Sequence, residues 1–556
     1  MGQASMTPPS APPLSLLRAP PFPWHDAAIT QPAPSRTSKP VLHDRDTLFA
    51  AIRQARVGGD FWADDAGVKR LAATVIRPGE PSEVEGTERP DTIWIPPVGT
   101  PRWTHALRGR TWCIDVDPWS VLPGASRLLA HGDDEWIALA RIAGIKVDVL
   151  STGGFGAPGD DAATLDGRVA ELLANQDWRD PFTGGSSTIE AVVDLLALWR
   201  HTLDLNRPIV STCGMAWWKR KEIGRFLWHP TRHLAMVPSP AQALRVARKE
   251  GGAIAVWPSR VSPALIAAAG QQGTALVRVE DGFVRSAGLG VDLVPPSSIV
   301  VDASGIHFDP GAPSDLEAVL NDAQMSARLL GRARSLREII VRAGISKYSA
   351  DQGQSVPERI PGKRLVLVPG QVEDDMSVRA GGGGLTSNLE LLRRARDLEP
   401  DAQIWFRPHP DVDAGHRKGK VPDTDILAHA DHIVRGGGMA PLLHAVDAVH
   451  VLTSLTGFEA LMRGREVTCH GTPFYAGWGL TRDLGPATPR RTARLSLDAL
   501  VAGVLILYPR YLDPVTGLPC PPEVLVSRMA SATAHNRLKW IGPLRRWQGK
   551  LMKMIR

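Results

Sequence analysis

Short apolar runs alternate with stretches of helical periodicity along the chain from about residue 205 onward. The runs are RPIVST, AIAVWPS, TALVRVE, SSIVVDA, RLVLVPG, QIWFRPH, AVHVLTS and REVTCHG. Runs of this length and composition are typical of buried strands, and helical patterns such as LTGFEALMRG separate most of them. Consecutive parallel strands need a crossover, which is usually a helix. The pattern therefore predicts an α/β fold with parallel sheets in two Rossmann-type halves, residues 205–361 and 362–515, that face a central cleft.

The pattern is weaker at both ends of the chain. Residues 1–100 form a poorly defined segment, and its first 40 residues are so rich in Pro, Ala and Ser that we expect a disordered or loosely attached leader. Residues 101–204 contain strand-like runs, WCIDVDPW and IKVDVLS, and read as an accessory α/β region leading into the first half. The segment LSLDALVAGVLILY predicts closing helices that pack back onto the body, and residues 516–556 read as a basic tail.

Composition narrows the class of protein. Of 556 residues, 43% are apolar and 22% charged, which is typical of soluble globular domains. The four cysteines lie far apart without a CxxC pair, so neither a disulfide framework nor a zinc site is indicated. The longest apolar run, residues 499–508, is about half of what a membrane span needs. With no signal-peptide pattern, we expect a cytoplasmic protein.

Charge is concentrated at the C-terminus. The net charge is +6, and the last 22 residues alone carry seven cations and no acid. The rest of the chain is close to neutral, which argues against a nucleic-acid-binding body. The tail mixes these cations with tryptophans, a combination that suits an anionic membrane surface. The alternative is a disordered basic tail.

Acidic side chains follow two of the predicted strands, where ligands bind in open α/β sheets. Glu280 and Asp281 end TALVRVED, and an arginine follows them. The alternative is a solvated turn with a surface ion pair. Glu373, Asp374 and Asp375 follow RLVLVPG. An acid and a nucleophile operating together are one interpretation of this acidic loop, and a loop that caps the following helix is the other.

Further polar residues follow two other strands. His409 lies between prolines, which restrict its backbone, so it can donate to a phosphate or carboxylate unless it is merely structural. Ser454 should open a helix whose N-terminus favours an anion, and Glu459 would point into the same cleft unless it only complements the helix dipole. The glycines 381–384 allow close approach of a phosphate but are more often a flexible loop. The aromatic loop 473–481 is either a platform for a sugar or base, or packing between the halves.

Seven motifs occur in an order that resembles a known family. They are GMAWWKRK (214–221), VEDGFVRSAGLG (279–290), SKYS (346–349), VPGQVEDDMS (368–377), RPHPDV (407–412), TSLTGFEALMRG (453–464) and PFYAGWGLT (473–481). Together they resemble the capsule polysaccharide biosynthesis proteins of the KpsC and LipB type, bacterial retaining β-Kdo glycosyltransferases. The likeness covers roughly residues 180–515. The family typically carries two such modules in tandem, and this chain is most similar to the second, C-terminal one.

The resemblance implies a GT-B-like fold, CMP-β-Kdo as donor and a lipid-linked saccharide as acceptor, with no metal or other cofactor. It assigns Asp375 as the nucleophile, with Asp374 as second choice, Glu280 as the acid/base, and His409 as a contact to donor phosphate or to the Kdo carboxylate. It also implies donor-binding residues, which are Arg285, Lys347, Gln371, Arg407, Ser454 and Glu459. Relatives often have lysine where this chain has Arg407.

With a lipid-linked acceptor, the enzyme should lie peripherally at the inner face of the inner membrane, where other capsule synthesis or export proteins are possible partners and nucleic acid is not. Two alternatives stay open. One is a non-catalytic assembly or export factor that binds nucleotide sugar or polysaccharide. The other is a transferase of another CMP-linked sugar acid.

Overall fold

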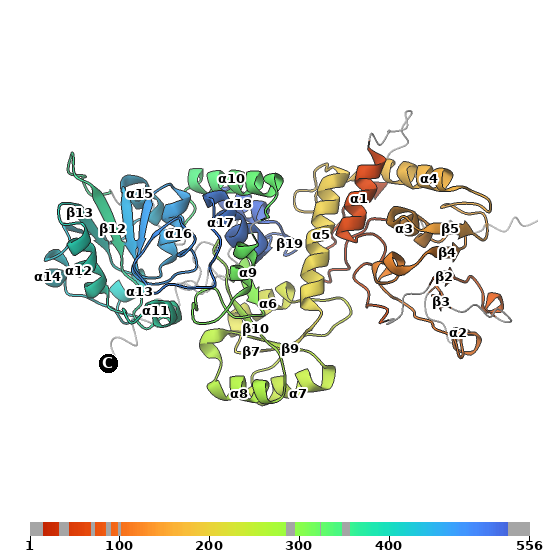
Figure 1. Ribbon diagram of the computed structural model, residues 1–556, viewed down its shortest axis with the longest axis horizontal. Coiled ribbons are helices and arrows are strands. Elements are labelled where there is room, and N and C mark those ends of the chain that lie inside the picture. The colour runs from red at the N-terminus through yellow and green to blue at the C-terminus, as the bar shows by residue number, and fades with distance from the viewer. Residues whose placement is uncertain are drawn as a thin grey trace, which may run out of the picture. The chain divides into compact units, whose positions relative to one another are not determined.

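The computed structural model describes residues 15–32, 44–67, 73–84, 91–97, 102–284, 295–322, 324–346 and 356–531. The chain divides into two compact units. The first, here unit 1, is Met1–Arg207 with Trp228–His233, and the second, unit 2, is Pro208–Leu227 with Leu234–Arg556. Figure 1 labels many of the elements of each unit.

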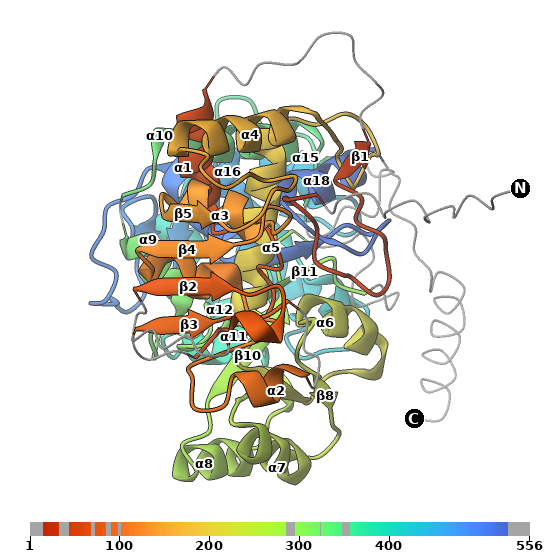
Figure 2. The same ribbon diagram turned by 90° about the vertical axis from the view of Figure 1, so that its right-hand side faces the viewer.

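Unit 1 is built on a parallel four-stranded sheet in the order β3-β2-β4-β5. Figure 2 shows these strands in that order. The strands are β2 Thr74–Arg77, β3 Thr92–Trp94, β4 Arg127–Ala130 and β5 Lys146–Val149, and a separate antiparallel pair joins β1 Thr30–Pro32 to β6 Gln176–Trp178. The helices are α1 Arg45–Ala55, α2 Arg102–Ala106, α3 Trp136–Ala143, α4 Ala162–Ala174 and α5 Ile189–Asn206, with short 3-10 turns η1 Pro81–Glu83, η2 Pro118–Ser120 and η3 Leu122–Gly124.

Unit 1 corrects two predictions. The boundary predicted at residue 100 is wrong, because one sheet contains strands from both sides of it. Residues 15–32, expected to be disordered or loosely attached, are packed: Leu16 and Leu17 are fully buried, and the Phe22 ring lies 5.2 Å from that of Trp199 on α5. Their apolar side chains drive this packing despite the prolines between them. The rest of residues 1–40 lies outside the described residues.

One strand prediction in this region also fails. The run WCIDVDPW forms two isolated bridges, at Trp112 and Val116, and then the 3-10 turn η2, not a strand. The Asp117 carboxylate accepts the Trp119 backbone N–H, which stabilises this turn in place of an extended conformation. The neighbouring run IKVDVLS is strand β5, as predicted.

The first half of unit 2 contains a mixed seven-stranded sheet in the order β19-β18-β11-β10-β9-β7-β8. Its strands are β7 Ile209–Cys213, β8 Ala235–Met236, β9 Ala253–Val256, β10 Leu276–Asp281, β11 Ser298–Asp302, β18 Pro509–Leu512 and β19 Pro519–Cys520, and its helices include α6 Arg220–Phe226, α7 Pro240–Glu250 and α8 Pro263–Gln271, with 3-10 turns η4 Trp217–Lys219 and η5 Pro258–Arg260. Strands β8, β7, β9 and β10 are parallel, whereas β11, β18 and β19 are antiparallel to their neighbours. The prediction of parallel pairing fails at β11, where no helical pattern separates it from β10 in the sequence.

The second half of unit 2 is a fully parallel six-stranded sheet in the order β14-β13-β12-β15-β16-β17. Its strands are β12 Leu365–Pro369, β13 Gln403–Arg407, β14 His432–Ile433, β15 Ala448–Val451, β16 Glu466–Cys469 and β17 Arg482–Asp483, and its helices are α11 Met376–Gly381, α12 Asn388–Leu398, α13 Pro410–Asp413, α14 Asp423–Leu427, α15 Met439–Ala445 and α16 Leu455–Met462. Strands β12, β13 and β15 are buried along their whole length, as expected for parallel strands covered on both faces.

After the second half the chain returns to the first. It forms α17 Leu497–Val501, the π-helix Ala502–Leu507, strands β18 and β19, and α18 Pro522–Ala530, which pack with α9 Asp315–Asn321 and α10 Ala327–Arg342. The predicted closing helices therefore do pack back onto the body. The boundary at residue 515 is wrong, because β19 and α18 belong to the body. The remainder of the predicted tail, residues 532–556, lies outside the described residues.

The α/β class with two halves built around largely parallel strands is thus confirmed. All eight runs named above from residue 205 onward form strands. Within the described ranges, no helix is long and apolar enough to cross a membrane.

Candidate functional site

The predicted site residues of the second half follow three neighbouring strands. Strands β13, β12 and β15 lie side by side in parallel, so their carboxyl ends share one edge of the sheet. The Gln371 side chain, just beyond β12, ties this edge together: its Nε2 donates to Thr453 Oγ1 at 3.0 Å, and its Oε1 accepts the Thr453 N–H at 2.8 Å. Gln371 is buried, so its amide serves as framework between the loops after β12 and β15.

The three carboxylates after β12 have separate partners. Glu373 accepts the Asn388 N–H at the start of α12, and Asp374 pairs with Arg417 at 3.2 Å. Asp375 is the N-cap of α11 and accepts the Ser377 hydroxyl at 2.6 Å. The helix-capping interpretation is therefore confirmed for Glu373 and Asp375. Capping does not exclude chemistry at Asp375, because its side chain is exposed and carries a second oxygen.

His409 is the N-cap of α13, and its Nδ1 accepts the Asp411 backbone N–H at 3.2 Å. A ring nitrogen that accepts carries no proton, so the neutral ring has its N–H at Nε2. The side chain is only 15% exposed, which restricts the ring to few orientations. The contact with the Asp411 backbone thus holds the His409 ring and, in its neutral form, assigns the proton to Nε2.

Arg407, which is predicted to bind the donor, lies at the end of β13. It is buried, and its two terminal nitrogens donate to the carbonyls of Gly436 and Gly437 at 2.7 and 2.6 Å. The planar guanidinium fork fits two adjacent carbonyls. Arg407 therefore holds the loop after β14 against the end of β13.

Ser454 and Glu459 lie on α16, which follows β15 as predicted. Ser454 caps the helix by accepting the Thr456 N–H at 3.2 Å. Glu459 lies within the next turn and is 5% exposed. Its charge is felt by Arg463, whose pKa burial lowers while Glu459 raises it.

In the first half, Glu280 lies near the carboxyl end of β10. Successive side chains of a strand point to opposite faces, so Glu280 and Asp281 diverge. Asp281 accepts from the Lys219 ammonium at 2.6 Å, and that ammonium lies 3.7 Å from the centre of the Trp257 ring. The sequence had singled out the motifs containing Lys219 and Asp281, but not this pair. The available signal in the sequence was that Lys219 and Asp281 each belong to one of the recognised motifs.

Aromatic side chains join the two halves of unit 2 just beyond Glu280. The Phe283 ring lies 4.7 Å from Phe474, 6.5 Å from Phe458 and 4.9 Å from His307. Three of the recognised motifs, VEDGF, TGFEA and PFYAG, therefore meet here. Phe474, Tyr475 and Trp478 are buried, so the aromatic loop is packing between the halves and not an exposed platform.

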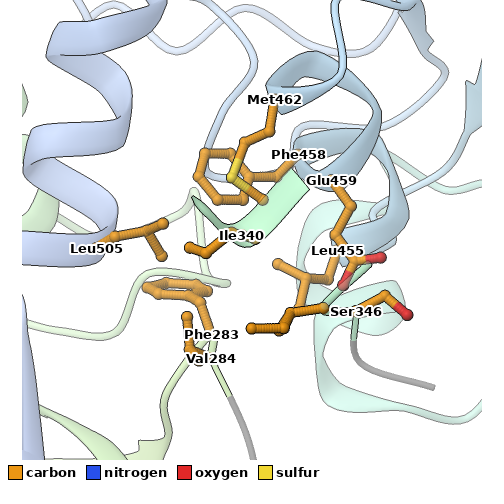
Figure 3. Close-up of a pocket in the computed structure, with 10 residues that line it drawn as sticks. Phe283, Val284, Ile340, Ser346, Leu455, Phe458, Glu459, Met462 and Leu505 are labelled. Carbon is orange, nitrogen blue, oxygen red and sulfur yellow. The ribbon is translucent and has the colours of Figure 1, made fainter. Parts of the chain in front are cut away.

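A small pocket lies at this junction. Figure 3 shows Glu459 and Ser346 on one side of it, with Phe283, Ile340 and Leu505 on another. Its volume of about 20 Å³ is enough for one water molecule. The pocket brings Glu459 close to the loop that follows Glu280.

Asp375 caps the start of α11, and the other end of this helix, Gly381, lies beside Thr453 and Thr472. Gly381, at its end, has its carbonyl bonded to the Thr472 N–H at 2.7 Å, and a Cβ there would meet the Thr453 side chain at 3.0 Å. Six helical residues span about 9 Å, so Asp375 lies roughly that far from Gly381. A Cβ on Gly471 would press on the Gly381 carbonyl, so at least this glycine of the 381–384 run serves close packing.

The structure thus gathers Gln371, Asp375, Arg407, His409 and Ser454 at one sheet edge, with Glu459 on the helix that follows it. Phe283 links that edge to the strand of Glu280. The predicted residues Arg285 and Lys347 lie outside the described residues. Over the ranges the structure describes, no three His, Cys, Asp or Glu side chains are placed to hold a metal ion.

Comparison with known proteins finds a matching family model and similar sequences. The family model described as "Capsule polysaccharide biosynthesis protein" matches residues 252–349 and 347–511, all within unit 2. The capsule polysaccharide modification protein LipA of Neisseria meningitidis serogroup A is 40% identical over 348 residues, 63% of this chain and 49% of that protein. The lipopolysaccharide-processing protein LpsZ of Rhizobium meliloti is 46% identical over 241 residues, 42% of this chain and 54% of that protein.

A solved structure, Thermosulfurimonas dismutans KpsC, beta Kdo 2,7 transferase, is 34% identical and covers 58% of this chain and 99% of that one, with a TM-score of 0.48. This chain spans about half the length of the curated relatives it matches. On the evidence of these sequence matches and the seven motifs, the chain belongs to the capsule polysaccharide biosynthesis protein family.

Proposed function

We propose that the protein acts in capsule polysaccharide biosynthesis as a retaining glycosyltransferase that moves Kdo from CMP-β-Kdo to a lipid-linked saccharide. Family membership supports the pathway, and the similarity to a chain titled beta Kdo 2,7 transferase supports the sugar. The two parallel-stranded halves are in keeping with a GT-B-like enzyme.

One observation carries the proposal. Asp375, His409 and Ser454 follow neighbouring parallel strands at one sheet edge, and Phe283, three residues after Glu280, packs on α16 and the aromatic loop of the same half. Three residues of extended chain span about 10 Å. Glu280 is therefore attached by a short tether to the region where the other candidates gather.

The chemistry assigned to these residues is double displacement. The Asp375 carboxylate attacks the anomeric carbon of Kdo and CMP leaves, forming a glycosyl-enzyme ester with inversion. Glu280 then takes the proton of the acceptor hydroxyl, whose oxygen displaces Asp375 with a second inversion, so the β configuration is retained. CMP is an acidic leaving group and departs as an anion without prior protonation.

The donor carries a phosphate diester and a sugar carboxylate, so donors of hydrogen bonds and cations must converge on it. His409 supplies the N–H of Nε2, and the N-terminal amides of α16 at Ser454 favour an anion. Arg285 and Lys347 are assigned as the cations. Arg407 acts by positioning the loop that contains Gly436 and Gly437, and Gln371 by positioning Thr453.

The remaining assignments concern the setting of the reaction. A lipid-linked acceptor places the enzyme peripherally at the inner face of the inner membrane, beside other proteins of capsule synthesis and export. These partners follow from the proposed acceptor.

The test is to measure CMP release from CMP-Kdo by the wild type and by Asp375→Ala, and to search for a Kdo adduct on the Asp375 peptide by mass spectrometry. We expect release to be abolished in the variant, and the adduct in the wild type only. Asp374→Ala is the matched control and should retain turnover. Full activity in Asp375→Ala would overturn the mechanism. CMP-Kdo binding without CMP release would favour the non-catalytic assembly factor, and faster release from another CMP-linked acid would change the sugar.

A further inference from the structure

Unit 1 contains a topological switch point that the matched family region does not include. The chain passes from β2 to the edge strand β3 on one side, then returns to β4 and β5 on the other. The strand order therefore reverses between β2 and β4. In open α/β sheets, ligands bind in the crevice at the carboxyl ends of the two strands that flank such a point.

A chain of hydrogen bonds joins the loops that follow these strands. His131 follows β4, and its Nε2 lies 3.0 Å from an oxygen of Glu83, which belongs to η1 after β2. Its Nδ1 lies 3.0 Å from the hydroxyl of Ser151, the second residue after β5. A carboxylate only accepts, so Nε2 carries the proton and Nδ1 accepts from the serine hydroxyl. The order Ser151, His131, Glu83 is thus hydroxyl, base and orienting acid.

Close backbone packing holds the serine beside the histidine. The loops after β4 and β5 touch at Gly132 and Gly153, where a Cβ on either would overlap the backbone of the other. Gly132 N–H also donates to the Ser151 carbonyl at 3.0 Å. On the other side, Gly79 N–H donates to the Glu83 carboxylate at 3.2 Å. Backbone contacts therefore position Ser151 and Glu83, and these two side chains hold the His131 ring between them.

The arrangement is accessible to a ligand. The side chains of His131 and Glu83 are 34% and 35% exposed, and Ser151 is half-buried. The amide of Thr152, the residue after the serine, makes no hydrogen bond within the described part of the chain. The N–H in this position is one of the two that stabilise the oxyanion in α/β-hydrolases.

We propose that unit 1 carries a second catalytic centre, Ser151–His131–Glu83, which hydrolyses carboxylic esters. The Ser151 oxygen attacks the ester carbonyl while its proton passes to His131 Nδ1, and His131 returns that proton to the departing alcohol. Water then attacks the acyl-serine, gives a proton to His131, and releases the carboxylic acid as the proton returns to Ser151. In the best-known triads the serine faces Nε2. Here it faces Nδ1, and the proton route is the same because Glu83 holds the other nitrogen.

The test uses the purified full chain and a fluorophosphonate probe, which phosphonylates activated serines and needs no knowledge of the ester. We expect the Ser151 peptide to be labelled and Ser151→Ala to lose that label. His131→Gln should label at least 100-fold more slowly, the size of effect expected from losing a general base. Glu83→Gln should also be slower. Ser187→Ala, which alters a half-buried serine of the same unit, is the matched control and should label like the wild type.

Two results would overturn the proposal: labelling of Ser151 no faster than labelling of Ser187, or an unchanged rate in His131→Gln. Ser151→Cys keeps the shape of the side chain and should lose fluorophosphonate labelling while remaining folded by circular dichroism. The assay contains no nucleotide sugar, so its outcome does not depend on the proposed Kdo transfer.

Discussion

Two parallel sheets in this chain expose their carboxyl edges in different ways. In the second half of unit 2, Gln371 and Arg407 are 8% and 4% exposed, and their hydrogen bonds go to neighbouring loops. At the edge of the unit 1 sheet, His131 and Glu83 are about one third exposed and bond each other. A buried polar group that loses its partner keeps its desolvation cost, whereas an exposed one turns to water. The buried groups are therefore framework, and the exposed ones, including Asp375, are the candidates for chemistry.

The largest effect of a single substitution on stability is expected at Lys219. Its side chain is 8% exposed, and its ammonium pairs with Asp281 and lies against Trp257. Lys219→Met leaves the Asp281 carboxylate in a poorly solvated place without its cation, and breaking a buried pair in this way costs about 3 to 5 kcal/mol. Urea unfolding measures the loss. Lys221→Met, at an exposed position two residues on, should change the free energy of unfolding little. A loss of free energy of unfolding below about 1 kcal/mol would mean that the Lys219–Asp281 pair behaves as a solvent-exposed ion pair.

Eight strands of unit 2 were predictable because each is a compact apolar run, and a helical pattern separates most of them. In unit 1, β2 and β3 were not, because they have only four and three residues and prolines interrupt the sequence around them. The return of β18 to pair with β11 joins residues more than 200 positions apart. Nothing local in LVAGVLILYPRYL indicates that partner.

The sequence predicted which sheet edge carries the candidate site, but not the hydrogen bonds that its side chains make. Residues after strands were expected to meet, and Gln371, His409 and Ser454 do share an edge. Local sequence patterns do not show which of these side chains form hydrogen bonds within the protein, because their partners are distant in sequence. Gln371 bonds Thr453, which is 82 residues away. The motif gives the residue type of Arg407 but not the direction of its guanidinium, which donates to the Gly436 and Gly437 carbonyls.

Buried histidines provide the next comparison with the exposed His131. His450 is fully buried, and its Nδ1 lies 3.1 Å from His470 Nε2. Burial lowers the pKa of each to about 4 from 6.5. Between these values the unfolded chain binds a proton at each histidine that the folded chain does not, so their contribution to stability falls as the pH drops from 6.5 to 4. The loss is about 3 kcal/mol per histidine.

Urea unfolding at pH 7.5, 6 and 5 measures this slope. His470→Asn should flatten it, because one of the two histidines no longer titrates. His416→Gln, which alters an exposed histidine, should leave the slope as in the wild type. An unchanged slope in His470→Asn would mean that the folded protein accepts the proton at this position.

A smaller effect separates the two interpretations of Arg407. Arg407→Lys keeps the charge but loses the fork that holds the Gly436 and Gly437 carbonyls, and we expect a loss of about 1 to 2 kcal/mol. Denaturation of this variant beside Arg393→Lys, an exposed control, measures it. If Arg407 instead binds donor directly, stability should hold while the KM for CMP-Kdo rises.

The smallest effect on stability is expected at Asp375. Substitution of this residue also tests most directly whether its role is structural or chemical. Asp375→Asn keeps an N-cap of equal quality for α11, because Asn accepts the backbone N–H as Asp does, so the free energy of unfolding should change by less than about 0.5 kcal/mol. The amide is no nucleophile, so CMP release should still be lost. Parallel urea unfolding and CMP-release assays on this one variant measure both quantities. A loss of activity with intact stability assigns chemistry to an exposed capping carboxylate. If activity survived, Asp375 would be a helix cap and the acidic loop would belong with Gln371 and Arg407 to the framework.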